Sequence, residues 1–108
     1  MKISFDYDST LSLKYWQLLA TKYLAAGHDV WIVTYRFMDG HPLNRFTNNG
    51  KVIAVATVLG IPIENIIFTN MEPKWKSLEG FDMHYDDDEV EIDDIKMNLH
   101  PQTIGILV

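Results

Sequence analysis

The sequence contains no cysteine, no long apolar run and no basic, hydrophobic leader at its start. Without cysteine the chain can form neither a disulfide framework nor a thiolate metal site, and we expect a cytoplasmic protein. No apolar stretch approaches the roughly 18 residues that span a membrane, and the first residues lack the pattern of a signal peptide. We therefore expect neither a membrane protein nor a disulfide-rich secreted one.

Basic residues are missing from one long segment. The stretch from Asp82 to Asp94 holds eight of the fifteen acidic residues and no Lys or Arg, so the net charge of −6 is a local property. The rest of the chain carries seven acids against nine bases, and the overall acidity does not exclude an anionic substrate. We expect Glu89 to Asp94 to form a solvated helix face and Asp88 to cap that helix.

Repeats, low-complexity tracts and linkers are also absent, and 108 residues suit a single domain, residues 1–108. The pattern predicts a loop over 36–48, strands over 2–7, 29–35, 65–70, 81–85 and 103–108, and helices over 12–26, 49–59, 72–80 and 89–99. This alternation predicts an α/β fold of three-layer, Rossmann-like type, with a mostly parallel five-stranded sheet and no cap domain. The ligand site of such a sheet lies at the carboxyl ends of its strands.

Polar side chains follow four of the predicted strands. They are Asp6 and Asp8, then Thr34 and Arg36, then Thr69, Asn70 and Lys74, then Asp86, Asp87 and Asp88. Because parallel strands end along one edge of a sheet, we expect these groups to meet in one crevice. Crowded carboxylates are costly unless a cation neutralises them, and oxygen ligands without Cys or a His cluster suit Mg²⁺.

Such a set of groups can carry out phosphoryl transfer. The Lys74 ammonium and the Thr34 hydroxyl can hold phosphoryl oxygens as negative charge develops on them. A carboxylate facing the phosphoryl group can attack it and form an aspartyl-phosphate. A second carboxylate can protonate the leaving oxygen and later activate water.

Four short segments, in their order along the chain, resemble the motifs of the haloacid dehalogenase superfamily. "FDYDST" is similar to the first motif, D-x-D-x-T after an apolar strand, and "VWIVTYR" to the second, a strand ending in Thr or Ser. Lys74 in "MEPKWKSL" resembles the third-motif lysine, and "MHYDDDE" resembles the acidic pair of the fourth. The resemblance covers essentially the whole chain and implies a central first strand that lies beside the fourth.

The resemblance also implies a role for each matching residue. Asp6 would be the nucleophile, and Asp8 the general acid and base. Thr34 and Lys74 would bind and stabilise the phosphoryl group. The implied Mg²⁺ ligands are Asp6, Asp8 through its backbone carbonyl, Asp86 and Asp87. The residues expected to contact substrate are Ser9, Thr10, Tyr35 and Arg36.

Several positions depart from the family pattern or leave an alternative open. Ser9 stands where the family often has Gly. The family usually has a helical turn and a hairpin flap after the first strand. We expect a helix capped by Ser12 here, so that the flap is minimal or absent. Lys76 competes with Lys74 for the third-motif role. Arg36 could grip a second phosphate, or it could form a salt bridge to the acidic loop.

These expectations lead to a capless Mg²⁺-dependent phosphatase. Its substrate would be a phosphorylated small molecule or a nucleotide or nucleic-acid end, because Thr34-x-Arg36 resembles the pattern of polynucleotide phosphatases. One alternative is a receiver-like module, although in receivers the lysine follows the acidic pair instead of preceding it. Another alternative is a non-catalytic member that binds Mg²⁺ or phosphate. A homodimer could cover the open site.

Overall fold

The computed structural model describes residues 1–44 and 48–108 and has an α/β fold with one central sheet. The strands are β1 (Lys2–Phe5), β2 (Asp29–Thr34), β3 (Ile66–Phe68), β4 (Met83–Asp86) and β5 (Ile104–Leu107). The helices are α1 (Lys14–Ala25), α2 (Gly50–Leu59) and α3 (Glu89–Asn98). The described residues also contain three short helical turns, η1 (Tyr7–Leu11), η2 (Ile63–Asn65) and η3 (Lys74–Ser77).

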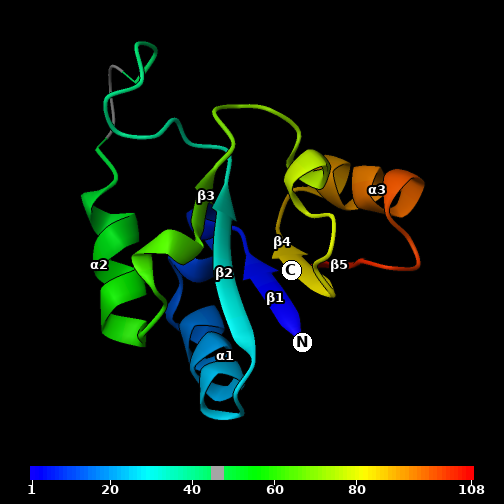
Figure 1. Ribbon diagram of the computed structural model, residues 1–108, viewed down its shortest axis with the longest axis horizontal. Helices are drawn as coiled ribbons and strands as arrows, with labels where there is room; N and C mark the ends of the chain where they lie inside the picture. Colours follow the sequence, from blue (N-terminus) through cyan, green and yellow to red (C-terminus); the bar gives the residue numbers. More distant parts are fainter. Residues whose placement is uncertain (45–47) are drawn as a thin grey trace.

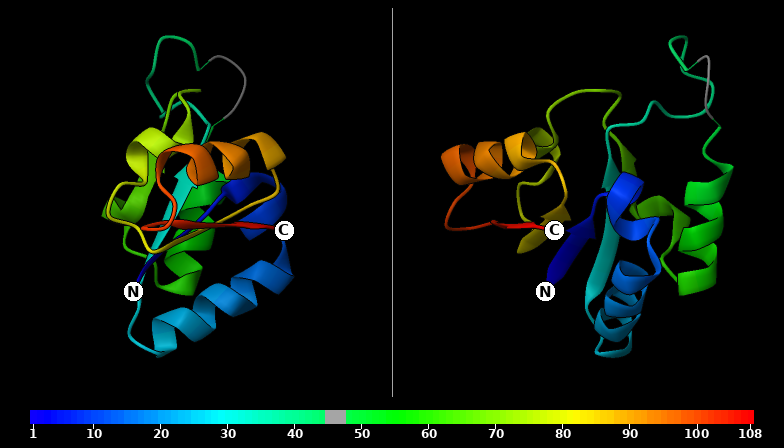
Figure 2. Two further views of the ribbon diagram at one scale, coloured as in Figure 1. Left: turned by 90° about the vertical axis from the view of Figure 1, so that its right-hand side faces the viewer. Right: turned by 180° about the vertical axis from the view of Figure 1, so that it is seen from behind.

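All five strands run parallel in the order β3-β2-β1-β4-β5, so β1 lies in the centre between β2 and β4. The helices α1 and α2 cover one face of the sheet, and α3 with η3 covers the other (Figures 1 and 2). The prediction of a parallel five-stranded α/β fold is confirmed. Within the described residues, no helix has the length and apolar character needed to cross a membrane.

Each face of the sheet has its own apolar core. Ile3, Phe5 and Ile32 belong to a buried cluster with residues of α1 and α2, including Ala20 and Val52. The opposite core contains the buried side chains Val33, Leu78, Phe81, Ile92 and Ile95. Because successive side chains of a strand point to opposite faces, the second core lies on the α3 side of the sheet.

The segment after β1 differs from its prediction. The strand ends at Phe5, two residues early, and the chain makes one wide helical turn, closed by bonds from Leu11 N–H to the Asp6 carbonyl (3.0 Å) and from Ser12 N–H to the Tyr7 carbonyl (2.8 Å). The predicted extension of the strand to Tyr7 is therefore wrong, because Tyr7 and Leu11 are buried in the core by the turn η1. Only two residues separate η1 from α1, so that segment holds no hairpin flap.

Two other predicted helices begin elsewhere or are shorter than expected. Helix α1 begins at Lys14 and is not capped by Ser12, whose hydroxyl accepts the backbone N–H of Ser9 (3.1 Å) instead. The expected helix over 72–80 is only the turn η3. The Asp88 cap is confirmed, since its carboxylate accepts the N–H of Val90 at 3.0 Å. The predicted loop has no helix or strand over 36–44, and its residues 45–47 lie outside the described residues.

Candidate functional site

A cavity of about 490 Å³ lies at the carboxyl edge of the sheet. Its lining comes from the ends of β1, β2 and β4, from η3 and from the start of α3. The lining residues are Asp6, Asp8, Ser9, Thr34, Tyr35, Lys74, Asp86, Asp87, Asp88 and Glu89. Most of the polar groups expected at this edge from the sequence therefore do meet in one crevice, and Lys74 is the one cation among the described lining residues.

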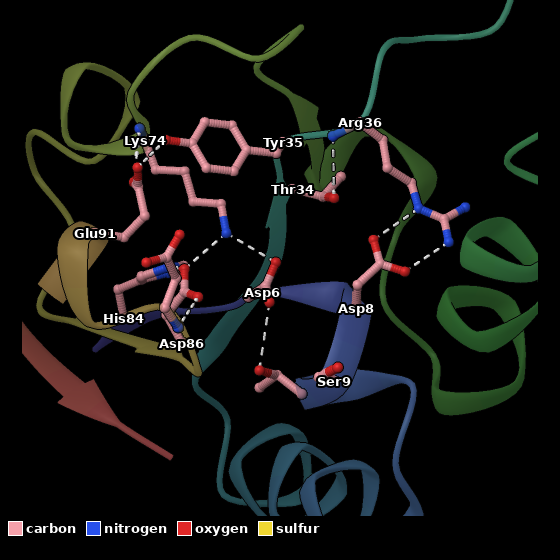
Figure 3. A network of polar contacts seen from close by, with 12 residues as sticks. Asp6, Asp8, Ser9, Thr34, Tyr35, Arg36, Lys74, His84, Asp86 and Glu91 are labelled. Carbon is pink, nitrogen blue, oxygen red and sulfur yellow. Dashed lines mark hydrogen bonds and ion pairs between the residues drawn. The ribbon is translucent and has the colours of Figure 1, made fainter. Parts of the chain in front are cut away.

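Lys74, which lines this cavity, points toward Asp6 and Asp86 at the ends of two strands (Figure 3). Its Nζ lies 2.8 Å from Asp6 Oδ1 and 2.7 Å from Asp86 Oδ2, and all three side chains are almost fully buried. Lys76, the alternative considered for this role, has an exposed side chain that lies 3.7 Å from Glu72. Of the two lysines, Lys74 is therefore the one that lies between the strand-end carboxylates.

The position of Lys74 is fixed from α3 and from the end of β2. Glu91, which is 0% exposed, accepts the backbone N–H of Lys74 at 2.9 Å and the hydroxyl hydrogen of Tyr35. The Tyr35 ring in turn lies 5.2 Å from Lys74 Nζ. Glu91 was expected on a solvated helix face, and that expectation is wrong because two donors from distant segments satisfy its buried carboxylate.

Burial and neighbouring charges shift the pKa values of the three buried groups in different directions. Burial raises the pKa of Asp6 to about 7, with a contribution from Asp86, although the charge of Lys74 opposes the rise. Burial also acts to raise the pKa of Asp86, but the hydrogen bond from His84 and the charge of Lys74 outweigh it and hold that pKa below its usual value. The two carboxylates keep the pKa of Lys74 above its ordinary value despite burial, so it is a cation.

Asp8 forms its ion pair with Arg36, not with Lys74. Its two carboxylate oxygens accept hydrogen bonds from Arg36 Nε (2.9 Å) and Nη2 (2.7 Å), and these bonds lower the pKa of Asp8 (Figure 3). Arg36 also donates to Asn49 Oδ1 at 3.5 Å and stacks 5.1 Å from the ring of Tyr7. The expected salt bridge of Arg36 therefore forms with Asp8 and not with the acidic loop that follows β4.

Three carboxylates are placed to bind a cation. One oxygen from each of Asp6, Asp86 and Asp87 lies within 4.8 Å of the others. All the ligand atoms are carboxylate oxygens, two of the three side chains are buried, and the cavity leaves space for water and substrate beside them. This donor set fits a hard divalent ion such as Mg²⁺, which binds to few carboxylates and keeps other positions for water or phosphate.

The residues expected to contact substrate are spread over three environments. Ser9 lines the cavity with a left-handed backbone (φ 58°), a conformation that glycine adopts more readily than serine. Thr34 also lines it, and its Oγ1 accepts the N–H of Arg36 at 3.3 Å. Thr10 is fully buried beneath Asp6, to which it donates at 3.4 Å, and Arg36 is turned toward Asp8.

Two buried polar residues next to the site were not foreseen from the sequence. His84 donates from Nε2 to Asp86 Oδ2 at 2.8 Å, and its Nδ1 lies 2.7 Å from the hydroxyl of Ser4. The sequence did contain a signal for them. In "ISFD" and "MHYD" a polar residue stands two positions before the site aspartate, so it lies on the same face of the strand as that aspartate.

The protein is thus an α/β protein with an acidic cavity at the carboxyl edge of its parallel sheet. In this cavity Lys74 bridges the carboxylates of Asp6 and Asp86. No protein-family model matches the chain, and no curated protein is similar enough to count as a match. The assignment of a function rests on the side chains and their geometry.

Proposed function

We propose that the protein is a Mg²⁺-dependent phosphomonoester hydrolase that works through an aspartyl-phosphate on Asp6. The observation that carries this proposal is the Lys74 ammonium held between Asp6 and Asp86, beside three carboxylates that can share a cation. The strand order, with β1 central and β4 beside it, also agrees with the resemblance to the haloacid dehalogenase superfamily.

Each residue around the cavity has a separate role in the proposed reaction. An Asp6 oxygen attacks phosphorus while the bond from phosphorus to the leaving oxygen breaks, and Asp8 gives its proton to that oxygen. Water then attacks phosphorus, Asp8 takes a proton from this water, and the bond to Asp6 breaks to release phosphate. Lys74 and the Thr34 hydroxyl stabilise the phosphoryl oxygens. Asp6, Asp86 and Asp87 would hold Mg²⁺, which supplies further neutralisation of the phosphoryl charge.

The Asp8–Arg36 pair supports a second candidate, a protein that binds Mg²⁺ and phosphate without turnover. A general acid must carry a proton, whereas two hydrogen bonds from Arg36 stabilise the ionised form of Asp8. Hydrolysis on this account requires that Asp8 leaves Arg36 when substrate binds. A receiver-like module has no comparable support, because Lys74 precedes the acidic residues of β4 along the chain.

A substrate screen separates the two candidates. Phosphate release would be measured from phosphorylated metabolites, nucleotides and oligonucleotides with a terminal phosphate, each with and without Mg²⁺. The hydrolase predicts release that requires Mg²⁺ and disappears in Asp6→Asn, while the charge control Asp93→Asn, on the exposed face of α3, stays active. Mg²⁺ binding without release from any substrate would support the non-catalytic candidate.

A further inference from the structure

Ser4 and His84 form a buried polar pair inside the sheet. They lie directly opposite each other in the parallel register of β1 and β4, and both are 0% exposed. Their chain neighbours Ile3, Phe5 and Tyr85 pack into the core on the side of α1 and α2. The pair therefore points to the α3 side of the sheet, the side on which Lys74 meets Asp6 and Asp86.

The hydrogen bonds of the pair define one tautomer of the histidine. The Asp86 carboxylate can only accept, so the proton of the ring lies on Nε2, 2.8 Å from Asp86 Oδ2. A ring that carries its proton on Nε2 accepts the hydroxyl hydrogen of Ser4 at Nδ1 across 2.7 Å, a shorter contact than the 3.4 Å from this hydroxyl to the Met83 carbonyl. A chain of two hydrogen bonds thus runs from Ser4 through His84 to Asp86.

A serine, a histidine and an aspartate in contact raise the question of a serine nucleophile. Neither Ser4 nor His84 lines the cavity at the sheet edge, and no part of either side chain is exposed. A substrate cannot reach the Ser4 hydroxyl, so the pair can act only through Asp86.

The bonds to Asp86 are distributed unequally over its two oxygens. Oδ2 accepts both His84 Nε2 (2.8 Å) and Lys74 Nζ (2.7 Å), whereas among the described residues Oδ1 accepts only the backbone N–H of Asp88 (3.0 Å). A carboxylate oxygen has two lone-pair positions, so Oδ2 is filled and Oδ1 keeps one position for a cation. His84 thus decides which oxygen of Asp86 remains available.

We propose that Ser4 and His84 are positioning residues that orient the Asp86 carboxylate for metal binding. This inference rests on the proposed function, because it needs Asp86 to be a Mg²⁺ ligand. Ser4 holds the histidine ring in the tautomer that donates to Asp86, and His84 prevents the carboxylate from rotating. Groups that orient a metal ligand in this way typically change metal affinity about 10- to 100-fold when they are removed.

The first test measures binding of Mg²⁺ alone by calorimetry. His84→Leu removes the donor to Asp86, and we expect Mg²⁺ affinity to fall about 10- to 100-fold. In His84→Gln the side-chain amide can take the place of Nε2, so much of the affinity should return. The control His28→Gln changes a histidine that precedes β2 at the amino end of the sheet, and it should bind Mg²⁺ as the wild type does.

The second test does not depend on metal. Nitrogen-15 shifts of His84 in the metal-free protein should report a proton on Nε2 and none on Nδ1, and Ser4→Ala should shift the Nδ1 signal and weaken Mg²⁺ binding. Ser4→Ala is a smaller change than His84→Leu, so it tests the inference even if His84→Leu does not fold. Wild-type Mg²⁺ affinity in both His84→Leu and Ser4→Ala, or a proton on Nδ1, would overturn the inference alone. Failure of the wild type to bind Mg²⁺ would overturn the proposed function together with it.

Discussion

Arg36 holds Asp8 through two parallel hydrogen bonds of 2.9 and 2.7 Å, one to each carboxylate oxygen. The guanidinium is fixed in turn by Asn49 and by the ring of Tyr7, so Asp8 is anchored to the loop that follows β2. Asp8 lines the same cavity as Lys74, but its carboxylate is paired with Arg36, which lies in the connection between β2 and α2.

Replacing Arg36 by Gln should raise the pKa of Asp8 toward its usual value, because the hydrogen bonds that lower it are lost. The carboxyl carbon of Asp8, followed by NMR during a pH titration, measures this change. The cost in folding free energy should stay below about 1 kcal/mol, since the Asp8 side chain is 57% exposed and such pairs are weak. An unchanged Asp8 pKa in Arg36→Gln would show that the ion pair is not formed in solution.

Replacing Glu91 by Ala should destabilise the protein strongly. The backbone N–H of Lys74 and the hydroxyl of Tyr35 lose a buried acceptor, for a combined cost of about 3 kcal/mol. In a chain of this size the melting temperature should drop by roughly 10 to 20 °C. The control Asp93→Ala, exposed on the same helix, should change stability by less than about 0.5 kcal/mol. Equal melting temperatures for the two variants would contradict the buried position of Glu91.

Mg²⁺ binding should strengthen as pH rises. The pKa of Asp6 in the metal-free protein is raised to about 7 by burial, and a ligand carboxylate must lose its proton before it binds a cation. The apparent affinity should therefore increase about tenfold between pH 6 and pH 8 and level off above that. Calorimetry at a series of pH values measures it, and Asp6→Asn should show a weaker affinity without this dependence. A wild-type affinity that is constant over this range would contradict the proposed role of Asp6.

The edge of the sheet at which the site lies could be predicted from the sequence. Asp6 and Asp86 each follow an apolar run directly, and Lys74 stands in the segment after a third. Parallel strands bring their carboxyl ends to one edge of the sheet. The particular contacts of Lys74 could not be predicted, because they depend on where η3 docks against α3.

The polar groups of the interior were harder to foresee. A charged residue in an acidic run is most often solvated, and Glu91 is buried only because Tyr35 and Lys74, distant in sequence, bring donors to it. The helical turn after β1 was missed for a similar reason. In the sequence Tyr7 continues the pattern of the strand. In the structure Tyr7 and Leu11 are buried in the core, and the chain must leave the strand direction and form the turn to bury both.

The most direct test of the central claim is the rate of Mg²⁺-dependent phosphate release by Asp6→Asn compared with the wild type, on a substrate found by the screen. Loss of the attacking oxygen should lower the rate by at least about 10³-fold. The variant should keep its folded state in circular dichroism, because Asn retains the size of the side chain. Hydrolysis by Asp6→Asn at the wild-type rate would contradict the assignment of Asp6 as the nucleophile.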